Sequence, residues 1–234
     1  MSPLGERGVA LVLALMTMVL MMALGAALVL VTSSETMIAA NFRAANEALY
    51  AADAVFERAL GDLGGAPGWK SVLSGGARSP FVDGPPTGVR TLADGSRIDL
   101  AEIANTANCQ KPVGCSDADL NAKTGDRPWG VNNPRWTPYA YGRLADVAGS
   151  PSISSPFYVV AFVGDDASEN DGDPTRDGVS VGGVSNPGLG LLSLRAEAFG
   201  PRGAHKVIEA TIARIDTPTA GLGGVRILSW REVR

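Results

Sequence analysis

The chain begins with an uninterrupted apolar run. Residues 9–31 carry no charge and include a single polar side chain, that of Thr17. An apolar stretch of about 20 residues, rising about 1.5 Å per residue, matches the ~30 Å hydrocarbon core of a bilayer. A secretory signal peptide has a shorter apolar core of about 7–15 residues, followed by small residues at a cleavage site. Ile38-Ala39-Ala40 is a poor site of that kind, so the pattern favours a retained transmembrane helix at 9–31 over a removed signal.

Beyond this run, apolar residues recur every three or four positions, which is the pattern of an amphipathic helix. No glycine or proline interrupts between Gly25 and Gly61, so residues 32–63 are predicted to continue the helix to a total of about 80 Å. Thr32-Ser33-Ser34-Glu35 also matches a capping box, which would start a second helix there. The apolar stripe consists of Ile38, Phe42, Ala45, Leu49, Ala52, Phe56, Ala59 and Leu63.

Residues 64–234 have a different pattern, rich in glycine, proline, asparagine and aspartate, without long helical periodicity or an internal repeat. This length is ample for one domain with its own core. Short runs rich in β-branched and aromatic residues, or alternating apolar with polar, predict strands. A turn-rich segment at 200–204 suits an antiparallel hairpin. The predicted strands lie at 157–163, 191–199, 206–215 and 225–231.

The two cysteines, Cys109 and Cys115, lie close together in a loop-like segment. Beyond a membrane span, in the periplasm, a disulfide between them would be stable. A zinc site needs about four ligands, and the single histidine, His205, lies far along the chain. The spacing is also not the C-x-x-C of a thioredoxin-like redox pair. The pattern therefore favours a structural disulfide.

Six carboxylates fall within residues 165–177 and repel one another unless they are solvated or neutralised. Oxygen ligands on a glycine-containing loop suit Ca²⁺, which takes about 6–8 oxygens. Asp171, Asp173 and Asp177 are the favoured ligands because they alternate along the loop and flank its glycine, although the glutamate that closes an EF-hand loop is missing. A solvated acidic loop between two strands is the simpler interpretation, and no other cofactor is expected.

Known catalytic signatures are missing from the sequence, which has no G-x-S-x-G, P-loop, H-E-x-x-H or paired Cys/His motif, so no catalytic residue is predicted. A net charge of −4 argues against non-specific binding of nucleic acid, which requires a basic surface. Trp129, Trp136, Tyr139 and Tyr141 lie near prolines and arginines. They are predicted to pack the sheet, and binding of a sugar or a partner protein is the alternative.

The N-terminal region resembles that of PilX-type minor pilins, which act in type IV pilus assembly and are related to the minor pseudopilins of type II secretion. The residues that carry this resemblance are Arg7-Gly8 before the apolar run, the segment 35–43 (ETMIAANFR) and the segment 48–54 (ALYAADA). The resemblance covers residues 1–60. It implies an α+β fold, in which a long N-terminal helix with a membrane-spanning first half packs on a C-terminal antiparallel β-sheet domain.

The resemblance also implies cleavage by a prepilin peptidase between Gly8 and Val9, so that residues 1–8 are a leader peptide. Major pilins carry a glutamate as the fifth mature residue, which pairs with the terminal amine of a neighbouring subunit. Here that position is Leu13. Certain minor members similarly lack the glutamate, which favours a position at the tip of the filament or at its initiation over one in its shaft.

We therefore expect a minor pilin rather than an enzyme. Arg7 orients the span so that the domain at 64–234 lies outside the cytoplasm. The predicted location is the bacterial inner membrane and then the pilus, and the predicted partners are other minor and major pilins, the prepilin peptidase and the inner-membrane assembly platform, without nucleic acid. The alternatives are a minor pseudopilin of a type II secretion system and a membrane-tethered periplasmic binding module or adhesin.

Overall fold

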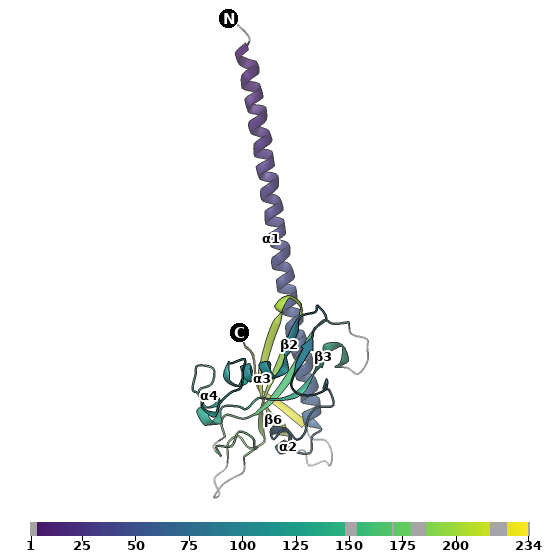
Figure 1. Ribbon diagram of the computed structural model, residues 1–234, viewed down its shortest axis with the longest axis vertical. Helices are drawn as coiled ribbons and strands as arrows, with labels where there is room; N and C mark the ends of the chain where they lie inside the picture. The colour runs from purple at the N-terminus through teal and green to yellow at the C-terminus, as the bar shows by residue number, and fades with distance from the viewer. Residues whose placement is uncertain (1–3, 148–153, 170, 179–185, 216–223, 234) are drawn as a thin grey trace. The chain divides into compact units, whose positions relative to one another are not determined.

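The computed structural model describes residues 4–147, 154–169, 171–178, 186–215 and 224–233 (Figure 1). The chain forms two compact units, Met1–Ala44 and Ala45–Arg234. The first helix, α1 (Leu4–Gly64), is continuous through residues of both units. Residues 1–3 of the predicted leader lie outside the described residues.

The helix does not restart at the sequence that matches a capping box. Thr32 donates its hydroxyl to the carbonyl of Leu28 at 2.9 Å, and Thr36 donates to Thr32 at 2.8 Å. Hydroxyls that bond to the carbonyl one turn earlier are satisfied inside a helix and do not act as caps. The prediction of one long helix is therefore confirmed, and the alternative of a second helix is wrong.

The second unit contains a five-stranded antiparallel sheet in which sequential strands are neighbours, in the order β3-β4-β5-β6-β7. The four predicted strands correspond to β4–β7, and the turn at 200–204 joins the paired strands β5 and β6. The sequence pattern did not predict β3, whose Tyr139 and Tyr141 were expected to pack the sheet, with binding of a sugar or a partner protein as the alternative. The strand bounds are β3 (Thr137–Arg143), β4 (Tyr158–Asp165), β5 (Leu191–Phe199), β6 (His205–Ile215) and β7 (Gly224–Val233).

Strand β4 is buried on both faces, which explains its continuous apolar sequence. Val159 and Ala161 face a core that includes the C-terminal part of α1, whereas Val160 and Phe162 face a second cluster. This alternation follows the two-residue period of a strand. Leu100, the first residue of α3 (Leu100–Cys109), belongs to the second cluster. The sheet thus lies between two apolar clusters within this unit.

The amphipathic stripe of α1 is buried only over its second half. Ile38 and Phe42 are exposed, and the predicted stripe omits Val55, which is fully buried beside Phe56. Several alanines on this face let the helix lie close to the sheet, because small side chains at the contact allow the helix backbone and the sheet backbone to approach each other. The buried face consists of Ala48, Ala51, Ala52, Val55, Phe56, Ala59 and Leu63.

Short elements complete the second unit. A two-stranded antiparallel sheet pairs β1 (Val89–Thr91) with β2 (Arg97–Asp99), and Asp99 caps the start of α3 by accepting from the Ala101 amide. Among the described residues, the remaining elements are α2 (Lys70–Leu73), α4 (Asp117–Leu120) and three 3₁₀ turns at Gly130–Asn132, Leu144–Asp146 and Pro201–Gly203.

Candidate functional site

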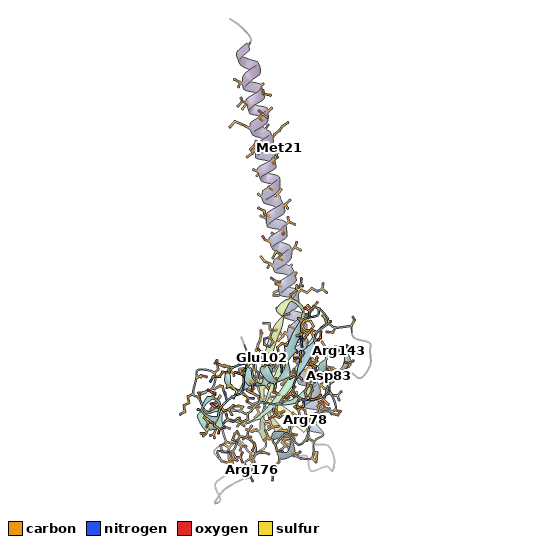
Figure 2. All side chains as sticks on the ribbon, viewed as in Figure 1. Met21, Arg78, Asp83, Glu102, Arg143 and Arg176 are labelled. Atoms are coloured by element: carbon orange, nitrogen blue, oxygen red, sulfur yellow. A yellow bond between two sulfur atoms is a disulfide. The ribbon has the colours of Figure 1, made fainter. Side chains whose placement is uncertain are left out.

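The first feature with functional meaning is the apolar surface of α1. Its large side chains between Val9 and Val31 are all more than half exposed, and Met21 extends into open space (Figure 2). Among the described residues, one helix, at Gly8–Gly64, is long and apolar enough to cross a membrane, with a mean hydropathy of 2.5 over its most apolar window. A continuous surface of this kind is unstable in water and is consistent with a membrane anchor.

The predicted cleavage point lies at the start of this surface. Gly8 and Val9 are both helical, and a Cβ added to Gly8 would meet no atom within 4 Å apart from its chain neighbours and the local helix backbone. The fold itself therefore does not require a glycine at this position. Leu13, on the same helix, is 58% exposed and adds to the apolar surface.

A second candidate site lies where β4 ends. Asp165 is the last residue of that strand, and one carboxylate oxygen each from Asp165, Glu169 and Asp171 lie within 4.8 Å of one another. Asp165 and Glu169 are only 4% and 3% exposed. Oδ1 of Asp165 and Oε1 of Glu169 are buried without a hydrogen-bond partner. Two buried carboxylates thus retain unsatisfied oxygens, and oxygens of this kind are ligands for a hard cation.

The electrostatics of this group follow from burial and like charge. Burial, with the nearby carboxylate of Glu169, raises the pKa of Asp165 to about 8. Burial, together with repulsion from Asp171 and Asp177, raises the pKa of Glu169 to about 7, although the Gly178 amide hydrogen bond opposes the shift. Close carboxylates in a dry setting disfavour the charged form unless a cation compensates.

The three ligands favoured from the sequence are not grouped in this way. Asp171 lies with Asp165 and Glu169. The Asp173 carboxylate accepts from the Thr175 amide and hydroxyl, and Asp177 accepts from the Gly190 amide at 2.7 Å. The sequence pattern did not select Asp165 and Glu169 as ligands, because it favoured aspartates that alternate along the loop. A signal existed for Asp165, which lies two residues after the apolar strand predicted at 157–163 and therefore close to the core of the sheet.

A disulfide joins Cys109, the last residue of α3, to Cys115, with the two Cα atoms 6.0 Å apart. Cys115 directly precedes Ser116, which caps α4 in a reciprocal capping box with Asp119. The bond therefore closes the connection between two helices. A loop this short contributes about 2 kcal/mol in the chain-entropy model.

We expect this bond in protein recovered from its native compartment. The denatured chain should not change mass on alkylation without reductant and should gain two adducts after reduction, because Cys109 and Cys115 are its two cysteines. Intact-mass spectrometry measures both states. Two adducts on the unreduced protein would show that the bond does not form there.

The aromatic residues highlighted in the sequence separate into core and surface positions. Tyr139 and Tyr141 are buried, and Trp136 packs against the second apolar cluster. Trp129 is half exposed and lines a cavity of about 710 Å³ together with residues of β5–β7. Arg195 lines the same cavity, where its guanidinium is paired with acidic side chains. Packing thus accounts for three of the four aromatics.

His205 begins β6, and its side chain is partly exposed. Its ring stacks on Phe199, with the centroids 4.5 Å apart, and Nε2 lies 2.9 Å from Oε2 of Glu197. Burial tends to raise the pKa of Glu197, but the bond to His205 and the charge of Arg195 outweigh it and hold the pKa below its usual value. The interactions of His205 thus stabilise the β5–β6 hairpin.

Comparison with known proteins gives a match that lies on α1. Residues 7–57 match the family described as PilX N-terminal, a segment that includes the apolar surface, Gly8, Leu13 and the beginning of the buried face. No match is found among curated proteins or solved structures. The family match and the long apolar helix agree with each other, and the likeness to PilX-type pilins extends over residues 7–57.

Proposed function

We propose that this chain is a minor pilin, a structural protein that initiates or caps type IV pilus assembly through its N-terminal helix. The observation that carries the proposal is the PilX-type N-terminal domain on a helix whose apolar surface is exposed from Val9 to Val31. Such a surface suits two environments in turn, the bilayer and a bundle of other pilin helices. The second unit, with its own core, is the part that remains in water.

Assembly follows from the physical chemistry of this helix. The prepilin peptidase removes residues 1–8 between Gly8 and Val9, and the mature protein waits in the inner membrane with residues 9–31 as its span. Residues 32–63 continue the helix, and residues 64–234 form the domain outside the cytoplasm. The assembly platform extracts the helix only if other pilin helices cover it again, because about 0.8 kcal/mol per CH₂ is otherwise lost to water.

Leu13 supports a position outside the shaft. In major pilins the glutamate at this position pairs with the terminal amine of a neighbour, and a buried charge is favourable only when it is paired. A leucine neither supplies nor needs that partner. The chain therefore enters the filament without the contact that repeats along the shaft, which fits a tip or an initiating complex with few copies.

The test is the composition of sheared pili. We expect this chain at a small fraction of the major subunit by quantitative mass spectrometry, and we expect its deletion to reduce the number of filaments more than their length. A copy number rivalling the major subunit contradicts the proposal. Recovery from secretion pseudopili, with pili unaffected by the deletion, would instead assign the chain to a type II secretion system.

A further inference from the structure

At the end of β4, two buried carboxyl groups are not fully satisfied by hydrogen bonds. Asp165 and Glu169 are each more than nine-tenths buried, and each keeps one oxygen that no donor reaches. A buried acceptor without a partner is unfavourable, and buried carboxylates in proteins are generally paired or bound to metal. The arrangement thus requires either a retained proton or a bound cation.

The glutamate is held in place while its free oxygen stays available. Its Oε2 accepts from the Gly178 amide at 2.8 Å and from Asn186 Nδ2 at 3.2 Å, which leaves Oε1 without a partner. Asn132 fixes the backbone of Glu169 by donating to its carbonyl at 2.7 Å. One oxygen of the carboxylate is therefore engaged by the protein and the other is left for a ligand.

Two glycines make this enclosure possible. A Cβ at Gly178 would collide with the Glu169 carboxylate and with Asn186, and a Cβ at Gly188 would collide with the Glu169 side chain. The chain therefore approaches the acidic group from two sides at distances that only glycine permits. This close packing distinguishes the surroundings of Glu169 from those of a solvated acidic loop, in which carboxylates point into water, whereas Asp171 is exposed.

The spacing of the oxygens fits one cation. The three carboxylates each bring an oxygen within 4.8 Å of the others. Two oxygens bound to the same Ca²⁺ at about 2.3–2.6 Å lie at most about 5 Å apart, and Ca²⁺ readily completes its shell of about 6–8 oxygens with water or carbonyl groups. We propose that Asp165, Glu169 and Asp171 bind one Ca²⁺ ion, which ties the end of β4 to the loop that follows it.

The proposal revises the ligand set favoured by the sequence, because it retains Asp171 and replaces Asp173 and Asp177 with Asp165 and Glu169. Asp173 offers a matched control. It is an aspartate of the same loop, but its carboxylate is partly exposed and accepts from Thr175. An aspartate-to-asparagine change at 165 or at 173 therefore replaces one carboxyl group with an amide in each case, but only the first removes a proposed ligand.

The experiment uses the full chain in detergent, freed of metal by chelation and dialysis and then titrated with CaCl₂ by calorimetry. We expect one Ca²⁺ per chain, with an affinity in the range of extracellular modules, about 10⁻⁴–10⁻³ M. Asp165→Asn and Glu169→Gln should each weaken binding at least about 10-fold, because each removes a charged ligand. Asp173→Asn should stay within about twofold of the parent, because its carboxylate is not a ligand.

A thermal melt of the same samples gives a second readout. Saturating Ca²⁺ should raise the Tm of the parent, since a ligand that binds the folded state stabilises it. The double variant Asp165→Asn/Glu169→Gln should melt at or above the metal-free parent, because its amides avoid the unfavourable burial of two carboxyl groups. It should not respond to Ca²⁺, because two of the proposed charged ligands are gone.

Two results would overturn the proposal. Absence of saturable Ca²⁺ binding by the parent at millimolar concentration would mean that the carboxylates are satisfied by protons. Equal loss of binding in Asp173→Asn and Asp165→Asn would place the ion elsewhere in the loop. The first result needs only the parent protein, so the proposal stays testable if a variant does not fold, and neither depends on pilus assembly.

Discussion

Replacement of Gly8 by leucine is expected to abolish removal of residues 1–8. The structure gives a Cβ at Gly8 no neighbour within 4 Å, so the helix accepts a larger side chain there. Under the proposed function, the need for a small residue comes from the prepilin peptidase, which has to reach the peptide bond between Gly8 and Val9 at the edge of the apolar span. Gly8→Ala should have a mild effect, because a methyl group adds little bulk. Intact-mass spectrometry of the membrane-extracted protein measures the mature N-terminus.

Gly25 provides the control for this experiment. It lies on the same helix and is equally free of neighbours around an added Cβ, but it is far from the proposed cleavage point. Gly25→Leu should therefore be processed as the parent is. Normal maturation of Gly8→Leu, or a parent protein that keeps Met1 in the filament, would refute cleavage between Gly8 and Val9.

Replacement of Phe56 by alanine is expected to destabilise the second unit by about 3–5 kcal/mol, because it leaves a cavity in a packed core. Phe56 is 1% exposed and belongs to the core between α1 and the sheet. This loss is a large part of the ~5–15 kcal/mol by which a domain is usually stable. A denaturant melt of the detergent-solubilised chain, followed by near-UV circular dichroism, reports the loss of tertiary packing.

Tyr50 is the matched control because it is an aromatic residue on the same helix and is 72% exposed. Tyr50→Ala should change the free energy of unfolding by less than about 0.5 kcal/mol, as is usual for a surface position. If the two variants were equally stable, the C-terminal part of α1 would not be packed on the sheet as described.

In α1, the local sequence pattern predicts the helix but not which of its residues are buried. The periodicity from Ile38 to Leu63 correctly predicts a helix, and the glycines from Gly61 onward mark its end. The same periodicity does not reveal that Ile38 and Phe42 are exposed and Val55 buried. Burial depends on where the sheet meets the helix, and that contact joins residues far apart in the chain.

In the acidic loop, the sequence alone does not identify the ligands. Its composition fits a cation site and a solvated turn equally, because both are rich in carboxylates and glycine. The choice of Asp165 and Glu169 depends on the approach of Gly178, which directly follows the acidic segment, and of Asn186 and Gly188, which lie further along the chain. A linear pattern of alternating aspartates contains no information on that approach.

The sequence by itself determined the membrane-length apolar helix, its amphipathic continuation, the α+β class and strands β4–β7, because these features depend on residues that are neighbours in the chain. The PilX-type character of residues 7–57 was also readable there. Only the tertiary structure decided that β3 completes the sheet, that β4 is covered on both faces, and which carboxylates are buried together. These properties arise from contacts between distant segments, where packing and the loss of solvent outweigh local preference.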